Sequence, residues 1–274
     1  MSTWQALVAT ESDGDPIFPA CAITDLSHFG LIRLSGDDKR TFLQGQVTND
    51  VNRVSAEQAQ LNSYCSPKGR MLGSFWMFQR GEDLYLQMPA DRLAPTLKRL
   101  SMYVLRSQVT ISDASDELVR FGIAGDCAEQ LLTDVPAENW GTLTRDAITV
   151  LRLPGDRPRF ELIGPVESMT ERWSEISAGA EVAGADFWAL MDIRAGLPTV
   201  FDETAEAFVP QMANLQLLDG VSFTKGCYTG QEVVARMQYL GKLKRRMYRG
   251  HVVAGERPGR GTELFSPLSD SAQG

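Results

Sequence analysis

Cysteine is scarce in this sequence, with four in 274 residues. Cys21, Cys65, Cys127 and Cys227 lie far apart, and no two of them form a C-x-x-C pair. Zinc sites and disulfide frameworks need cysteines at close, recurring spacings, so neither is expected. A chain without such a framework fits a reducing compartment.

Long apolar runs and a targeting leader are also missing. The first 15 residues have neither the basic start nor the apolar core of a secretory signal. No apolar stretch reaches the roughly 20 residues that cross a bilayer. We therefore expect a cytoplasmic protein without membrane contacts.

Positive charge is in deficit, with 27 Lys and Arg against 35 Asp and Glu and a formal net charge of -8. This balance argues against a surface built to hold a nucleic-acid backbone. One segment, 242–249, is basic and contains Lys242, Lys244, Arg245, Arg246 and Arg249. A solvated strand face is favoured there over an anion site. A tRNA-binding module is disfavoured, and any tRNA contact is expected to be indirect.

The sequence also lacks low-complexity segments and short repeats, and its composition is that of an ordinary globular protein. Predicted strands and helices recur without strict alternation, which favours an α+β fold with mixed sheets. The pattern divides the chain into an N-terminal α+β part at 1–114, a second α+β part at 115–240 and the start of an incomplete C-terminal β-barrel at 241–274.

Apolar periodicity and turn residues predict the individual elements. Strands are expected at 31–34, 59–65, 71–79, 84–88, 105–111, 118–125, 148–153, 160–163, 245–253 and 263–265. A short helix is expected after Asp37, running through Leu43 and closing at Gly45, and further helices are expected at 91–104, 128–132, 167–176 and 187–195. The helix at 91–104 should be capped by Asp91 and the last one ended by Gly196. Residues 66–69 should form the turn of a hairpin.

The segment KGCYTGQE, residues 225–232, carries the most specific chemistry. Thr229 and Glu232 have the spacing of a capping box, which places Cys227 just before a helix N-terminus. That position and the charge of Lys225 favour the thiolate over the thiol, while Gly226 and Gly230 leave room for a ligand or partner. The alternative is a cysteine packed as a small hydrophobe in a glycine loop.

The run from 209 to 249 resembles the YgfZ family, whose hallmark K-G-C-Y-x-G-Q-E is present as Lys225, Gly226, Cys227, Tyr228, Gly230, Gln231 and Glu232. Three other stretches resemble it as well, at 42–51, 66–71 and 188–198. The resemblance implies the architecture of the glycine-cleavage aminomethyltransferase, GcvT. It implies α+β layers, a small C-terminal β-barrel and tetrahydrofolate, a folate derivative, in a central cavity.

The resemblance also proposes folate contacts. Phe29 and Trp188 fall on two aromatic positions linked with folate, and Arg194 stands where the transferases carry a pterin-contacting glutamate. Lys68 and Arg70 are candidates for the anionic folate tail. The alternatives are core packing for the two aromatic residues and solvated surface positions for the three cations.

Two functions follow from the resemblance. The first is a folate-binding accessory protein for the assembly, maintenance or repair of iron–sulfur proteins, including tRNA-modifying enzymes, that uses Cys227. Its partners would be iron–sulfur proteins or cluster-assembly factors. The second is a folate-dependent aminomethyl transferase. Gly73 and Ser74 stand where a transferase needs an aspartate, so aminomethyl transfer is not the expected activity.

Overall fold

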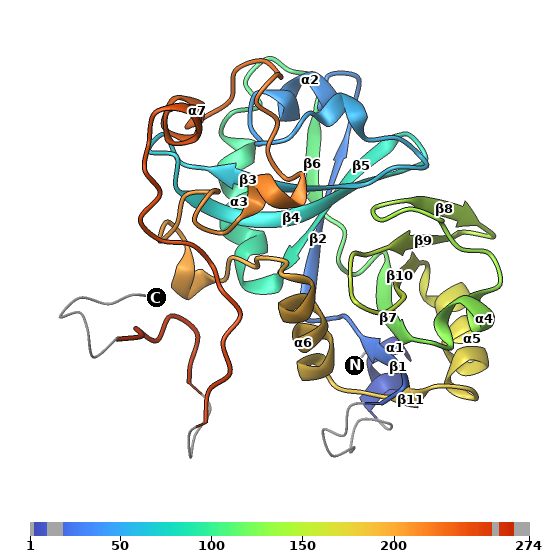
Figure 1. Cartoon of the computed structure of the whole chain (residues 1–274). Coiled ribbons are helices and arrows are strands. Elements are labelled where there is room, and N and C mark those ends of the chain that lie inside the picture. The colour runs from blue at the N-terminus through green and yellow to red at the C-terminus, as the bar shows by residue number, and fades with distance from the viewer. Residues whose placement is uncertain (1–2, 10–18, 254–257, 266–274) are drawn as a thin grey trace.

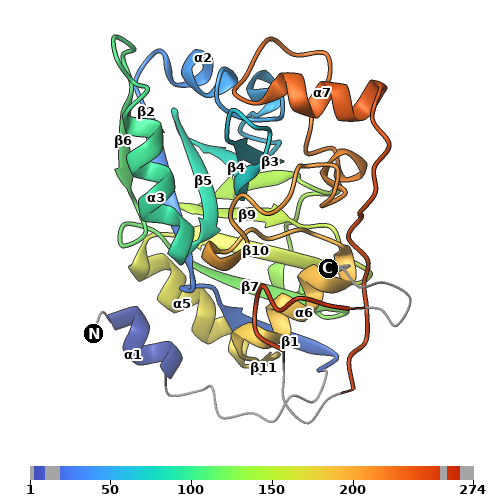
Figure 2. The ribbon, with the colours of Figure 1, turned by 90° about the vertical axis from the view of Figure 1, so that its left-hand side faces the viewer.

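The computed structural model describes residues 3–9, 19–253 and 258–265. Two β-sheets pack against each other, and helices cover their outer faces (Figures 1 and 2). Strands and helices are mixed without strict alternation. The α+β class predicted from the sequence is therefore confirmed.

One sheet has five antiparallel strands in the order β3-β4-β5-β2-β6. They are β2 (Phe29–Ser35), β3 (Gln60–Cys65), β4 (Met71–Arg80), β5 (Asp83–Pro89) and β6 (Thr110–Asp113). Along β4, Phe75 and Met77 pack on the side of helix α3 (Ala90–Ser101), and Trp76 and Phe78 pack on the other side. Both faces of this sheet are therefore buried.

The turn predicted at 66–69 between β3 and β4 is confirmed. The Ser66 N–H donates to the Arg70 carbonyl at 2.8 Å, and the Gly69 N–H donates to the Ser66 carbonyl at 2.8 Å. Gly69 has φ +68°, the left-handed region that side chains disfavour. Helix α2 (Lys39–Gln44) ends at Gly45, as predicted.

The other sheet has six strands in the order β11-β1-β7-β10-β9-β8. They are β1 (Cys21–Asp25), β7 (Val119–Gly125), β8 (Thr142–Arg145), β9 (Ile148–Arg152), β10 (Arg159–Gly164) and β11 (Glu181–Val182). Its outer face packs against α1 (Thr3–Ala9), α4 (Ala128–Leu132) and α5 (Val166–Ser177). There Trp173 makes edge contacts with Trp4 and Phe121 at 5.5 and 5.2 Å between ring centroids.

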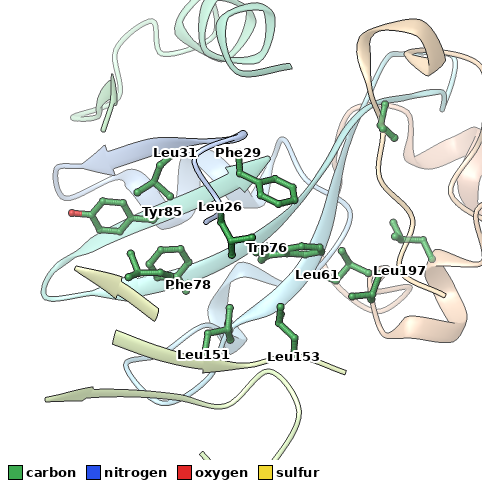
Figure 3. Close-up of a cluster of buried hydrophobic side chains, with 14 of the residues drawn as sticks. Leu26, Phe29, Leu31, Leu61, Trp76, Phe78, Tyr85, Leu151, Leu153 and Leu197 are labelled. Carbon is green, nitrogen blue, oxygen red and sulfur yellow. The ribbon is translucent and has the colours of Figure 1, made fainter. Parts of the chain in front are cut away.

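A core of apolar side chains fills the space between the two sheets (Figure 3). Phe29 and Trp76 of the five-stranded sheet lie 6.4 Å apart between ring centroids, and Leu151 and Leu153 come from β9 and the residue after it. Helix α6 (Ala185–Ala195) joins this core through Trp188, whose ring lies over Gly122 of β7. A Cβ at residue 122 would lie 2.2 Å from that ring, so only glycine fits there.

Two predicted boundaries are wrong. Asp91 does not cap α3, because the helix begins at Ala90 after Pro89 and places Asp91 in its first turn. The strand expected over 105–111 begins only at Thr110, because the chain first makes an exposed loop in which Leu105 has φ +42°. Leu105 is 88% exposed, so its apolar side chain marks no buried strand.

The part after helix α7 (Gln231–Tyr239) also differs from the prediction. The strands expected at 245–253 and 263–265 are irregular chain, and within the described residues after 240 no strand forms. This segment runs along the outside of the molecule (Figures 1 and 2). A barrel start is therefore not formed in this part of the structure.

The expectation that no disulfide forms is wrong. Cys21 and Cys127 are disulfide-bonded, with Cα atoms 5.6 Å apart and a sequence separation of 106. The cause is strand register, because β1 pairs with β7 so that Cys21 faces Gly125, two residues before Cys127. The sequence separation of the two cysteines does not indicate that they lie close together in the fold. Cys65 and Cys227 are free.

Strand β1 precedes residue 114 in sequence, yet it belongs to the six-stranded sheet with β7 to β11. The chain thus forms β1 of the six-stranded sheet first, then the five-stranded sheet, and then the remaining strands of the six-stranded sheet. The division at 114 into separate folding units stays a prediction. None of the helices within the described ranges has the length and apolarity that a bilayer crossing requires.

Charged side chains are buried between the sheets beside Trp188. Glu161 is fully buried, and the ion pair Arg159–Asp192 joins β10 to α6 at 2.8 Å. Arg120 donates to the Phe29 carbonyl at 2.8 Å. Burial raises the pKa of the Glu161 carboxyl to about 7, against the opposing influences of Gln87 and Arg120.

We expect this carboxyl to make stability fall as pH rises from 5 to 8. Because its folded-state pKa lies above the ordinary 4.5, the folded chain binds the extra proton between these two values. Relative to Glu161→Gln, wild type should lose about 2.5 kcal/mol of unfolding free energy over that range. Urea unfolding of both proteins at four pH values measures the difference. A difference that does not change with pH would contradict a titrating Glu161.

Candidate functional site

Hydrogen bonds from Lys225 hold the KGCYTGQE segment against the loop after α2. Its buried ammonium donates three hydrogen bonds, to the carbonyls of Gln44 at 2.8 Å, Val47 at 2.7 Å and Asn49 at 2.9 Å. All three protons of the ammonium are thus used on backbone oxygens. Two stretches that carry the family resemblance, 42–51 and 225–232, therefore meet through one side chain.

The Lys225 side chain also lies close to an aromatic ring of its own segment. Its ammonium lies 5.1 Å from the centre of the Tyr228 ring. Burial lowers the pKa of Lys225 to about 8, and the charge of Asp50 opposes this shift. Burial also raises the pKa of Tyr228. Both side chains are buried, whereas Cys227, which lies between them in sequence, is exposed.

A third stretch of the resemblance packs against the same segment. A Cβ on Gly230 would lie 2.4 Å from the Ser66 carbonyl oxygen, and one on Gly69 would lie 2.8 Å from Val233. The hairpin turn at 66–69 therefore touches the start of α7 through two glycines. Figures 1 and 2 both show α2 and α7 at the same end of the molecule.

The capping box predicted for Thr229 and Glu232 is wrong. Helix α7 begins at Gln231 after Gly230, which has φ +84°, and no side chain caps it. The Gln231 side chain instead accepts a hydrogen bond from the Tyr228 N–H at 3.2 Å. Glu232 is exposed in the first turn, where an acid favours the helix dipole.

Cys227 is the exposed one of the two free cysteines. A Cβ on the neighbouring Gly226 would meet no atom within 4 Å, so the loop is open on that side. Cys65 on β3 is the contrast, because it is fully buried and burial raises the pKa of its thiol to about 12. The geometry leaves the thiol of Cys227 accessible to a partner.

The residues predicted to hold folate do not gather at one place. Phe29 and Trp188 are both buried in the core between the sheets. Arg194 forms an ion pair with Asp156, and Arg70 donates to the Ala207 carbonyl at 2.5 Å. Lys68 is exposed at the tip of the hairpin turn. Whether any of them contacts folate stays a prediction.

A cavity of about 390 Å³ lies between residues 198–213 and the basic segment. Its lining residues are mostly apolar, with two arginines: Met71, Pro198, Thr199, Val200, Thr204, Phe208, Met212, Ala213, Arg245, Arg246, Met247, Tyr248 and Leu264. Neither Phe29 nor Trp188 is among them. Sequence reasoning named Arg245 and Arg246 only as part of the basic segment and missed the cavity, which begins beside the hairpin turn and at the end of the stretch 188–198.

The structure also shows the place where a transferase would need an aspartate. The Ser74 hydroxyl accepts a hydrogen bond from the Val200 N–H at 2.9 Å, and the Gly73 carbonyl accepts one from the Ser63 hydroxyl at 2.8 Å. No carboxylate side chain stands at either position of β4. Ser74 instead holds the backbone that lines the cavity.

Comparison with known proteins places the chain in a family. The GCVT N-terminal domain family matches residues 3–149. The "tRNA-modifying protein YgfZ" of Colwellia psychrerythraea is 34% identical over 234 residues, which cover 84% of this chain and 71% of the relative. The protein of the same name from Yersinia pseudotuberculosis is 34% identical over 230 residues, covering 82% and 69%.

A solved structure shows the same fold. The glycine cleavage system aminomethyltransferase T of Bartonella henselae superposes with a TM-score of 0.68 at 15% sequence identity. The match covers 86% of this chain and 66% of the transferase, so the chain spans slightly less than two thirds of that protein. With the family match, the identity to YgfZ proteins and the shared fold together, the chain belongs to the YgfZ family of GCVT-domain proteins.

Proposed function

We propose that this chain is a folate-binding accessory protein that supports iron–sulfur proteins, including tRNA-modifying enzymes, through Cys227. Its partners are iron–sulfur proteins or cluster-assembly factors, and tRNA is reached through them. The name of its relatives, tRNA-modifying protein, supports the link to tRNA modification. We propose that the protein acts in the cytoplasm.

One observation carries the proposal. Three stretches far apart in sequence, 42–51, 66–70 and 225–233, are packed together by Lys225 and two glycines, and one of the exposed residues of these stretches is a free cysteine, Cys227. Lys225 and the glycine contacts fix the loop, while Cys227 takes part in none of these contacts and stays accessible. This arrangement fits a thiol presented to another protein.

The cavity beside the basic segment is where we place tetrahydrofolate. Its volume of about 390 Å³ lies within the range of roughly 300–1,000 Å³ typical of small-molecule sites. Met71, Val200 and Phe208 offer apolar surface to a flat pterin, and Thr199 offers a hydroxyl. Arg246 at the same cavity would pair with a carboxylate of the folate tail.

Transferase chemistry is the less favoured function. Gly73 and Ser74 provide no carboxylate, and the Ser74 hydroxyl already holds the Val200 N–H. A general acid or base for cleavage of the aminomethyl group is therefore missing at the expected place.

The folate assignment predicts a specific loss of affinity. Arg246→Ala should weaken tetrahydrofolate binding about tenfold, because it removes a charge-assisted hydrogen bond to the tail. Arg249→Ala is the matched control, since Arg249 is exposed in the same segment but does not line the cavity. Calorimetric titration of wild type and both variants measures the effect. Equal affinity in all three would reject the cavity, and no binding to wild type would reject folate.

A further inference from the structure

A second hollow lies beside α3 and shares no lining residue with the proposed folate cavity. It has a volume of about 270 Å³ and is lined by residues of β3, β4 and α3 and by the residue after that helix: Tyr64, Leu72, Arg92, Pro95, Thr96, Lys98, Arg99 and Met102. We infer that this hollow binds a small organic anion whose carboxylate or phosphate group is held by Lys98 and Arg99.

The three cationic side chains of the hollow differ in whether they form ion pairs. Arg92 is committed to the structure, because it forms an ion pair with Asp202 and donates to the Leu72 carbonyl at 3.0 Å. Lys98 and Arg99 have no carboxylate partner among the residues at 3–9, 19–253 and 258–265. Acidic residues outnumber basic ones in this chain, yet two cations here face a hollow without a counter-ion.

Two buried donors in the hollow also lack a partner. Thr96 is 2% exposed and its hydroxyl makes no hydrogen bond. The guanidinium of Arg99 lies 6.0 Å from the centre of the Tyr64 ring, and its Nε–H is buried without an acceptor. Buried polar groups are ordinarily hydrogen-bonded, so unpaired donors beside a hollow need an explanation. An oxyanion supplies acceptors to a hydroxyl, a guanidinium and an ammonium at once. Its negative charge also balances the two cations.

The apolar residues that line the hollow indicate what the uncharged part of the ligand is. Leu72, Pro95 and Met102 are apolar, and Met102 is 58% exposed at the rim. These surfaces fit a small apolar body, such as one aromatic ring, attached to the anionic group. The larger hollow on the six-stranded sheet, about 650 Å³, does not share this character. Its charges pair with each other, as Arg145 with Asp134 and Arg172 with Glu175.

Titration of the full chain with phenyl phosphate, benzoate and inorganic phosphate tests the site by NMR chemical shifts and calorimetry. Phenyl phosphate or benzoate should bind saturably below about 10 mM, and whichever binds tighter identifies the anionic group. Inorganic phosphate should bind at least about tenfold more weakly than phenyl phosphate, because it lacks the apolar body. Inorganic phosphate as tight as phenyl phosphate would reject the apolar part of the site.

Variants separate the site from nonspecific charge. Lys98→Met, at an exposed position, and Thr96→Val should each lower the affinity for the tighter aromatic anion about fivefold to tenfold. Arg106→Met is the matched control, because Arg106 is exposed on the neighbouring loop and does not line the hollow. The inference is overturned if no probe saturates by about 10 mM, or if Arg106→Met weakens binding as much as Lys98→Met.

Discussion

Replacing Cys227 with serine is expected to abolish the support that this protein gives to iron–sulfur enzymes, while tetrahydrofolate binding and stability stay near wild type. The serine replaces only the sulfur atom with oxygen at an exposed loop position, so the packing of the buried Lys225 and Tyr228 is kept. A hydroxyl at that position is a far weaker nucleophile and metal ligand than a thiol. Loss of function without loss of folding would locate the chemistry in the sulfur.

The measurement is complementation of a deletion strain, read out as the activity of an iron–sulfur enzyme and the level of the tRNA modification that depends on one. Thr224→Ala is the matched control, because Thr224 is also exposed in this loop and carries no thiol. We expect the control to restore both readouts and Cys227→Ser to restore less than about a tenth of either. Full rescue by the serine variant would show that the thiol has no part in the function.

The secondary structure could be predicted well from the sequence because most elements have a clear local pattern. Helix 128–132 and the turn at 66–69 were predicted at their observed positions, since periodicity and turn residues act over a few neighbours. The predicted strand at 245–253 failed for the complementary reason. A strand needs a partner in space, and alternation in the sequence does not provide one.

The candidate site was less accessible to sequence reasoning. Cys227 was found because its motif is specific, but the role of Lys225 was not, since the three carbonyls that it binds lie about 180 positions earlier in the chain. Every residue has a backbone carbonyl, so the sequence does not show which of them accept these hydrogen bonds. The Cys21–Cys127 disulfide was missed in the same way, because it depends on the register between β1 and β7.

Lys225 should contribute strongly to stability through these carbonyls. In Lys225→Met the aliphatic stem and its packing are largely kept, while the oxygens of Gln44, Val47 and Asn49 lose their shared donor. Buried acceptors left without partners cost roughly 1–3 kcal/mol each, and water entering the site offsets part of this cost. We expect a net loss of about 3 kcal/mol, or a fall in Tm of about 6–10 °C.

The same substitution should expose Cys65. The loop that Lys225 holds pairs with β3 through the Val47–Tyr64 bridge, and Cys65 follows Tyr64 in that strand. In wild type an alkylating reagent should modify Cys227 quickly and Cys65 only on unfolding, because Cys65 is buried and its thiol pKa is raised to about 12. Release of the loop should let Cys65 react under native conditions, at least about tenfold faster than in wild type.

Mass spectrometry of alkylated peptides follows the two cysteines separately, and thermal unfolding gives Tm for the same samples. Lys242→Met is the matched control, since it removes the same charge from an exposed position and should change neither quantity. If Lys225→Met has the same Tm and the same cysteine alkylation rates as wild type, water bonds to the three carbonyls in place of the ammonium without loss of stability. The fastening of the loop would then rest on the glycine contacts between the hairpin turn and α7 alone.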